Sequence, residues 1–435
     1  MNSVANPARG DSTACVHRGV SSGNPNHGSL LHGTTLALRP ATRFACLALT
    51  LAALVWPAHA QEDEGFRFST GAQLQHDDNL FRLPPGADAV TLLGRSDASD
   101  ALLVTSAGVG FERRYSLQKI FAEFQLVDYN FQRFSQFDLS ATNYGLRWEW
   151  AYTPQLQGRL LAERRETLDS FDGAATSLAN GNRRLQTRQG VDLRYELDGR
   201  WSLQSGLFHR QDRRDQATVG EDGFRQNTLE AGVQRSFGSG SQITARLSRD
   251  LGRNLNSTLV VGDSYHQNNL WVDLLWKASG LTSAEFSLNA LNRSHPAASA
   301  LDYNGLSASG SVKWQPTGKL LWTLSGSSLL DSYQGLSSTH ARTDKLGLDG
   351  LWSITARTAL RAGVQQSRLR LLGHPTGGIT NPRRDSERET ALTLTWKPGD
   401  LFTLESSLKN RKRDSNQSVF DYSSTLFSLG LTASF

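Results

Sequence analysis

The sequence predicts an all-β fold: a transmembrane antiparallel β-barrel of about 18 strands, closed by its C-terminal strand. Three observations carry this prediction. A secretory signal precedes the main part of the chain, the residues after it alternate between apolar and polar side chains, and the last segment ends on an aromatic residue, Phe435. Strands of an outer-membrane barrel have one face in lipid and one in water, so they show this alternation. Sixteen strands is the alternative count.

Residues 1–60 are expected to lie outside the barrel. The segment 1–38 has no hydrophobic period and is predicted to be disordered, and an apolar run follows over residues 44–56. This run is shorter than the roughly 20 residues of a membrane-spanning helix. Ala-His-Ala at 58–60 has the pattern of a signal-peptide cleavage site. We expect a cleaved signal peptide, with an uncleaved anchor as the alternative, and a barrel over residues 61–435.

The composition excludes several classes of site. Both cysteines, Cys15 and Cys46, lie in the leader, so residues 61–435 can form no disulfide and no cysteine-based metal site. The leader has four Arg and one Asp, a net charge of +3, which leaves +2 of the total +5 for the remaining residues. This balance does not predict a nucleic-acid partner. We expect no metal and no cofactor.

The alternation is clearest over residues 143–152. One face is apolar and aromatic: Tyr144, Leu146, Trp148, Trp150 and Tyr152. An Arg on the lipid face near the membrane midplane would cost about 2–4 kcal/mol, so Arg147, on the other face, is predicted to point into the barrel. The same pattern recurs in other segments, among them 190–197 and 242–249.

The connections between these segments alternate in length. Eight short turns rich in Gly, Pro and Asp alternate with nine longer polar loops, which makes seventeen connections and eighteen strands. Bacterial barrels have short periplasmic turns and long extracellular loops. Seven Trp residues lie near the short turns, where an aromatic girdle is expected: Trp150, Trp201, Trp276, Trp314, Trp322, Trp352 and Trp396. A β-propeller is the lesser alternative, because each period of about forty residues holds two strands rather than four.

The closing strand is predicted over residues 419–435, where every second residue from Phe427 to Phe435 is apolar. We expect it to pair with a first strand at residues 65–74. The terminal aromatic Phe435 is predicted to be an assembly signal for the barrel-insertion machinery.

Charged side chains on the polar faces of the strands are predicted to line the pore. They are Arg147, Glu149, Arg159, Glu163, Asp192, Arg194, Glu196, Arg246 and Arg361. Opposed acidic and basic rows in a pore tune ion selectivity, and Gln and aromatic residues among them suit sugars. The alternative is that these groups only neutralise one another. Arg213–Arg214 and Arg411–Arg413 are expected in extracellular loops, where they would meet lipopolysaccharide phosphates.

A compact polar motif follows the first strand: His76, Asp77, Asp78, Asn79, Leu80, Phe81 and Arg82. Its oxygen ligands suit a divalent cation, but an Asx-rich turn that bonds its own backbone is the favoured interpretation.

This motif, with the Arg-rich strands and the terminal Phe, resembles the EpsL-type exosortase-associated extracellular polysaccharide biosynthesis family. The resemblance implies a porin-like outer-membrane barrel that transports exopolysaccharide, with extracellular polysaccharide and periplasmic polysaccharide-export components as partners. It carries over no catalytic residue, and we expect no enzyme. The alternative is a surface barrel that acts through its extracellular loops as an enzyme or adhesin. In either case the sequence predicts location in the outer membrane of a Gram-negative cell, among its lipids and lipopolysaccharide.

Overall fold

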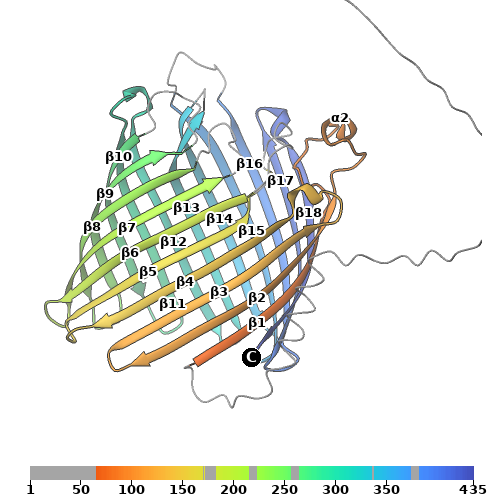
Figure 1. The fold of residues 1–435 in the computed structure, drawn as a ribbon. Helices are drawn as coiled ribbons and strands as arrows, with labels where there is room; N and C mark the ends of the chain where they lie inside the picture. Colours follow the sequence, from red (N-terminus) through yellow and green to blue (C-terminus); the bar gives the residue numbers. More distant parts are fainter. Residues whose placement is uncertain are drawn as a thin grey trace, which may run out of the picture. The chain divides into compact units, whose positions relative to one another are not determined.

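A computed structural model describes residues 65–169, 171, 183–214, 223–255, 264–335, 338–373 and 382–435. The predicted leader, residues 1–60, lies outside this part of the chain. Eighteen strands form one antiparallel sheet in which each strand pairs with the next, and β1 pairs with β18 to close the ring (Figure 1). The predicted barrel of 18 strands is confirmed, and the count of 16 is wrong.

The strands are β1 (Gly65–Asp77), β2 (Asp100–Tyr115), β3 (Gln118–Phe131), β4 (Leu139–Ala151), β5 (Leu156–Leu168), β6 (Arg183–Glu196), β7 (Trp201–Arg214), β8 (Phe224–Ser236), β9 (Gln242–Asn254), β10 (Ser264–Lys277), β11 (Thr282–Ser294), β12 (Tyr303–Thr317), β13 (Leu320–Gly335), β14 (Ser338–Ser353), β15 (Thr358–Leu372), β16 (Arg384–Trp396), β17 (Phe402–Ser415) and β18 (Tyr422–Ser434).

Short helical turns lie in four of the long connections: α2 (Ala89–Leu93), η1 (Ser135–Phe137), η2 (Ser299–Leu301) and η3 (Ser418–Phe420). α2 is capped at its start by the Asp88 carboxylate, which accepts bonds from the backbone of Val90 and Thr91, and at its end by Gly94 in the left-handed region, φ 68°. Within the described residues, no helix has the length and hydropathy to cross a bilayer.

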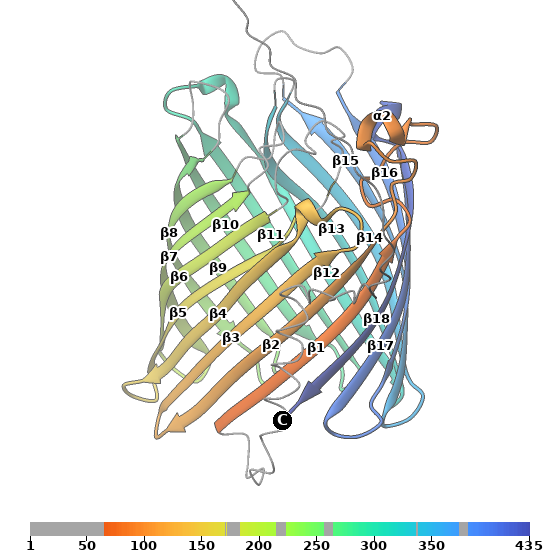
Figure 2. The same cartoon turned by 45° about the vertical axis from the view of Figure 1, so that its right-hand side comes forward.

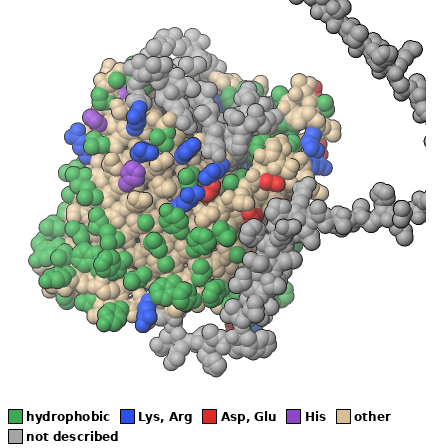
Figure 3. Space-filling view, in the orientation of Figure 1, with side chains coloured by type: hydrophobic (Ala, Val, Ile, Leu, Met, Phe, Trp, Pro, Cys, Tyr) green, Lys and Arg blue, Asp and Glu red, His purple; other side chains and the backbone are tan. Residues whose placement is uncertain are grey.

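The outer face carries the predicted apolar rows. On β4 the side chains of Tyr144, Leu146 and Trp148 are 37%, 51% and 44% exposed, and hydrophobic residues form a broad belt around the face seen in Figure 3. Apolar side chains left in contact with solvent to this extent on a monomer indicate a lipid-facing surface. Six of the seven predicted girdle residues are large exposed side chains beside short turns: Trp201, Trp276, Trp314, Trp322, Trp352 and Trp396.

The ring closes between β1 and β18. Their ladder runs from Ser69, opposite Ser434, to Asp77, opposite Leu426, and Figure 2 shows the two strands side by side with the C-terminus at the short-turn end. Phe435 and Phe68 exchange two backbone hydrogen bonds of 2.8 and 3.0 Å. The predicted pairing is confirmed, but the predicted start of the last strand at residue 419 is wrong. Val419 belongs to η3, and β18 begins at Tyr422.

The strands β12 and β13 are hydrogen-bonded to each other over only part of their length. The regular pairing of β12 with β13 ends at Ala308 opposite Ser328. Toward the long loops, side-chain contacts replace the backbone pairing. Leu330 donates its backbone N–H to the Ser307 hydroxyl at 2.9 Å, and the Tyr303 ring stacks on His340 with centroids 4.7 Å apart.

Candidate functional site

The interior of the barrel is the candidate site. Because side chains alternate along a strand, residues adjacent to the lipid-facing rows point inward. This alternation places all nine predicted pore-lining residues on the inner face. The ladders decide which of them meet, because residues directly opposite one another on neighbouring strands are in contact range.

The inner face of β2–β9, which we call the charged wall, borders a hollow of about 740 Å³. Seven cationic side chains line it against three acidic ones: Arg114, Lys119, Arg159, Arg188, Arg194, Arg210 and Arg246, with Glu149, Asp192 and Glu230. The hollow is therefore cationic overall and attracts anions.

Several arginines of the inner face are held by carboxylates on the same strand or on a neighbouring one. Arg159 Nε lies 2.8 Å from Asp192 on β6, and Arg246 Nη2 lies 2.8 Å from Asp273 on β10. Arg147 pairs with Glu149 along β4 at 3.2 Å and also lies over the Phe121 ring, 4.0 Å from its centroid. Each pair fixes a guanidinium while leaving some of its donors for a solute.

The remaining predicted residues lie apart from these ion pairs. Glu163 lies opposite Arg188, Arg194 lies opposite Gln157 and Gln204, and Glu196 lies opposite Ser202 at the end of β6. Arg361 is 3.6 Å from Asp349 on the far wall. It lies among β14–β16 and outside the charged hollow.

Five charged residues of the hollow were not predicted from the sequence: Arg114, Lys119, Arg188, Arg210 and Glu230. Arg188 on β6 lies directly opposite Arg210 on β7, and the Arg188 guanidinium sits over the Phe208 ring, 5.0 Å from its centroid. Side by side, two like charges repel, so this position favours an anion between them. The sequence could have indicated Arg188, because the alternation of residues 190–197 continues back to residue 183 and places Arg188 on the same face as Asp192.

The inner face of β11–β13 is different, and we call it the serine wall. Serines from adjacent strands lie opposite one another, with Ser309 facing both Ser287 and Ser327. A hollow of about 610 Å³ borders this wall, and its charged lining consists of one cation, Lys345, and two acids, Asp273 and Glu285. Small hydroxyl groups there leave room and offer weak, adaptable hydrogen bonds.

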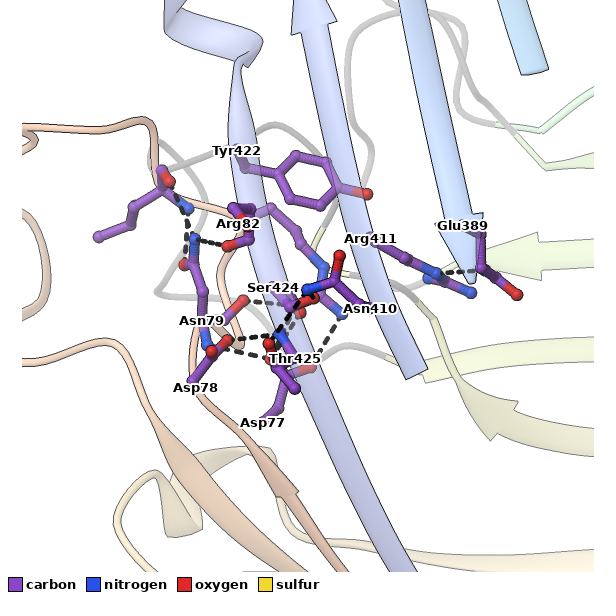
Figure 4. A network of polar contacts seen from close by, with 12 residues as sticks. Asp77, Asp78, Asn79, Arg82, Glu389, Asn410, Arg411, Tyr422, Ser424 and Thr425 are labelled. Atoms are coloured by element: carbon purple, nitrogen blue, oxygen red, sulfur yellow. Dashed lines mark hydrogen bonds and ion pairs between the residues drawn. The ribbon is translucent and has the colours of Figure 1, made fainter. Parts of the chain in front are cut away.

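The motif after β1 joins the two ends of the barrel wall (Figure 4). The Asp77 carboxylate accepts from the Ser424 hydroxyl at 3.0 Å, Asp78 accepts from the Thr425 backbone at 2.7 Å, and Asn79 donates to the Ser423 carbonyl at 3.0 Å. We call this set the seam clasp, because all three bonds cross from β1 and its loop to β18.

Arg82 completes the seam clasp. Its Nη1 donates to Ser424 at 2.8 Å, its Nη2 pairs with Asp77 at 2.9 Å, and its guanidinium lies 5.5 Å from the Tyr422 ring centroid. Its backbone is left-handed, φ 56°, which is unfavourable for a residue with a side chain and persists only where the surroundings impose it.

The predicted Asx-rich turn is confirmed. Asn79 donates its backbone N–H to Asp77 at 3.0 Å, and the Asn79 side chain accepts from the Leu83 backbone at 2.9 Å. Among the described residues, no group of three or more His, Cys, Asp or Glu is placed to hold a metal ion. His76 pairs with Phe427 and Ala101 within the sheet.

The apolar part of the motif anchors the extracellular loops. Phe81 is 3% exposed and packs on Phe134 and Phe171 with ring centroids 4.7 and 4.9 Å apart. Leu80 packs against the same cluster. The motif therefore fixes both the seam and the loops above it.

The expectation that Arg411 and Arg413 lie in a loop and meet lipid phosphates is wrong. Both belong to β17 and face inward, where Arg411 pairs with Glu389 at 2.5 Å and Arg413 with Glu387 at 2.8 Å. Arg214 likewise faces inward and pairs with Asp169 at 3.2 Å, whereas its neighbour Arg213 faces outward.

No family model and no curated protein match this sequence. Solved barrels of Pseudomonas aeruginosa do share its fold. OpdQ aligns with a TM-score of 0.52 at 9% identity, over 86% of this chain and 98% of OpdQ. OccK2 (OpdF), solved in complex with glucuronate, aligns with a TM-score of 0.51 at 10% identity, over 86% of this chain and 97% of OccK2.

The outer membrane protein OpdK aligns with a TM-score of 0.50 at 12% identity, over 85% of this chain and 99% of OpdK. At these identities the likeness concerns the fold. Together with the lipid-facing belt, it establishes an outer-membrane β-barrel with the architecture of a porin.

Proposed function

We propose that this protein is a channel through which an exopolysaccharide leaves the cell. The observation that carries the proposal is the contrast between the cationic wall on β2–β9 and the serine wall on β11–β13, which face the same lumen. A barrel of this strand number encloses an aqueous channel rather than a packed core.

The two walls suit a long, hydrated, anionic sugar chain. Guanidinium groups bind carboxylates through forked hydrogen bonds, and the Arg188–Arg210 pair offers two such groups side by side. The hydroxyls around Ser309 exchange bonds with sugar hydroxyls at little energetic difference. Contacts that are individually weak and repeated along the wall let the chain move without stalling.

Two further observations support a sugar substrate. The motif at residues 76–84 resembles the EpsL-type family, whose members are encoded with exopolysaccharide synthesis. OccK2, a barrel of the same architecture, has been solved with glucuronate, a sugar acid. The driving force in this proposal comes from synthesis or from periplasmic export components, because a passive lumen supplies none.

A deletion strain with periplasmic and secreted polysaccharide measured separately tests this function. We expect polysaccharide to accumulate in the periplasm, and the wild-type gene to restore export. A variant with Arg188→Gln and Arg210→Gln should restore it poorly. The matched control, Lys313→Gln with Lys345→Gln, removes two inward cations from the other side and should restore it well.

Normal secretion by the deletion strain would rule out the export function. Conductance of the purified barrel in planar bilayers separates the remaining possibilities. A barrel without measurable conductance, even after its loops are trimmed, would favour a surface enzyme or adhesin instead.

A further inference from the structure

The wall of the barrel is incomplete between β12 and β13. Their regular ladder ends at Ala308 opposite Ser328, although both strands continue toward the long loops. On their other sides, β12 stays paired with β11 and β13 with β14 up to these ends. Residues 303–307 of β12 and 329–335 of β13 therefore have no regular ladder between them, and we call this region the overlap.

In the overlap the end of β12 lies outside the end of β13. By alternation, Leu291 and Tyr303 are on the inner face of β11–β12, whereas Leu330 and His340 are on the outer face of β13–β14. These residues are nevertheless in contact. Leu291, Tyr303 and Leu330 form one buried cluster, and the Tyr303 ring stacks on His340. The inner face of one strand pair can meet the outer face of the next only where the two strand ends lie one over the other.

Burial on the two strands agrees with this arrangement. Leu330 on β13 is 6% exposed, whereas Leu306, the outward residue of β12 in the same region, is 57% exposed. A Cβ atom at Gly305 would come within 2.8 Å of the Leu330 side chain, so this glycine leaves the space that Leu330 occupies beneath β12. The backbone N–H of Leu330 donates to the Ser307 hydroxyl at 2.9 Å.

The overlap begins within the lipid-facing belt. Ala308, the last regularly paired residue of β12, lies opposite Leu288 on β11. Leu288 faces outward and is 47% exposed. The overlap therefore adjoins the acyl chains of the outer leaflet, where an ordinary barrel junction is closed by backbone hydrogen bonds.

A hollow lies on each side of the wall next to the overlap. The hollow of the serine wall is on the inside, and an apolar groove of about 390 Å³ on the outside is bordered by Phe286, Leu324 and Leu346. Gly310 and Gly326 lie opposite each other on β12 and β13 and line both hollows. A polar surface and an apolar one are thus separated by the thickness of a single sheet.

The junction of β4 with β5 is a useful comparison, because its ladder also stops early, at Tyr144 opposite Arg164. Charged groups hold the residues beyond it. The buried Glu166 carboxylate accepts from the Thr142 backbone at 3.4 Å and pairs with Arg164 at 2.8 Å. Separating these strands would leave a buried charge without its partners, which is strongly unfavourable. The cluster in the overlap is apolar, so a hydrocarbon chain can replace its contacts.

We infer that the overlap is a lateral passage through which an amphipathic molecule with a hydrocarbon chain moves between the lumen and the outer leaflet. The chain passes between Tyr303 and Leu330 and reaches the apolar groove, while the polar end stays on the serine wall. Opening the overlap disrupts no regular backbone ladder, because none joins its two strand ends. This inference concerns the wall of the barrel and does not depend on the export of exopolysaccharide.

A disulfide across the overlap tests the passage. Ser307→Cys with Leu330→Cys links the two layers, and residues 61–435 contain no other cysteine, so oxidised and reduced forms of one variant can be compared. The control is Asn292→Cys with Asn304→Cys, outward residues directly opposite on the continuous β11–β12 ladder. Each full barrel is reconstituted in vesicles of phosphatidylethanolamine and phosphatidylglycerol. The probe is hexadecyl glucoside with a photoreactive diazirine in its alkyl chain, and mass spectrometry locates the attached label.

The label should reach both sides of the wall unless the overlap is locked. In the wild type, the reduced lock and both forms of the control, it should attach to Tyr303, to Leu329, which faces the lumen, and to Leu346 in the outer groove. Oxidation of the lock should lower labelling of Tyr303 and Leu329 at least tenfold and leave that of Leu346 unchanged. Equal labelling of Tyr303 and Leu329 in the oxidised and reduced lock would overturn the inference, as would wild-type labelling confined to the outer groove. Heat-dependent gel mobility verifies that each variant is folded.

Discussion

The charged wall and the serine wall are built from the same kind of strand and line one lumen, yet they present opposite chemistry. The hollow beside the charged wall has seven cations and three acids, whereas that beside the serine wall has one cation and two acids. Guanidiniums on the charged wall are held in place by cross-strand carboxylates such as Asp192. On the serine wall, Ser309 and its neighbours leave the surface small and neutral.

The difference suggests a division of labour. Charge selects and orients a solute at long range, because its field extends across a water-filled space. Short hydroxyl side chains act only at contact, and they occupy little volume. A lumen with charge all round would bind a polyanion tightly, whereas one wall of each kind would attract the proposed substrate and still let it slide.

Loss of ring closure removes both walls at once and should have the largest effect. Deleting Phe435 and the residues before it breaks the two backbone bonds with Phe68 and exposes unpaired strand groups to lipid, each of which is costly there. We expect most of the folded protein to disappear from the outer membrane, measured by heat-dependent gel mobility. Normal levels of folded barrel after truncation would contradict the assembly role.

Reversing charge on one wall should have the next largest effect. Arg188→Glu with Arg210→Glu changes the charged wall by four units, and a unit charge about 10 Å from a permeating ion is worth about 1–2 kcal/mol at an effective dielectric near 20. We expect anion preference to fall at least roughly tenfold in planar-bilayer reversal potentials.

Lys313→Glu with Lys345→Glu applies the same change in charge beside the serine wall. These side chains lie away from the cationic hollow, so we expect a clearly smaller shift in selectivity. Equal shifts from the two double variants would mean that the two walls contribute equally to ion selectivity.

Added bulk should separate the walls in the opposite sense. Ser309→Tyr narrows the serine wall, so export of polysaccharide should fall several-fold while conductance of small ions falls little. Ala308→Tyr, the adjacent residue on the lipid face, is the control and should leave both unchanged. A parallel loss of both measurements would indicate simple blockage.

A change to mildly acidic pH should have the smallest effect, and it should destabilise only the loop above the serine wall. Burial of the imidazole lowers the pKa of His295, in the loop above the serine wall. In the unfolded loop His295 takes up a proton as pH falls below about 6.5, whereas in the folded loop it resists protonation. The stability of the folded loop is therefore full above that pH and is lost in mild acid. Above the charged wall, hydrogen bonds from Ser99 lower the pKa of Asp97 to about 2, so that rim keeps its stability until pH falls below about 4.

Hydrogen exchange at pH 7.5 and 5.5, corrected for the intrinsic rate, checks this difference. Peptides covering residues 295–302 should lose protection at pH 5.5, while peptides covering 95–100 should not. His295→Gln should remove the response. An unchanged response in that variant would assign it to another group.

The sequence predicted the strand count and which residues of each strand share a face, because turns and period-two alternation are local signals. It predicted the loops less well. Near the long loops the strands extend beyond the hydrophobic belt, and both faces become polar, as at Arg411–Arg413 on β17. The alternation that marks a strand vanishes there, so strand was mistaken for loop.

Partners across the sheet could not be predicted from the sequence because they depend on register. No local pattern indicates that Arg188 meets Arg210 or that Arg159 meets Asp192, since both pairings follow from the offset of adjacent strands. The motif after β1 was visible as a turn, but its bonds to Ser424 and Thr425 join residues at opposite ends of the barrel sequence.

The seam clasp also affects the order of folding events. Asp77 and Ser424 are separated by 347 positions in the sequence, so the first turn of the barrel completes its set of hydrogen bonds only when the last strand is in place. Asp77 keeps Asn79 and Arg82 as local partners, so a missing last strand removes one hydrogen bond to its charged carboxylate, a loss of about 1.5–3 kcal/mol. A barrel that stops short of its final strand therefore carries a local penalty at its very beginning, and the clasp acts as a check that the chain has been completed.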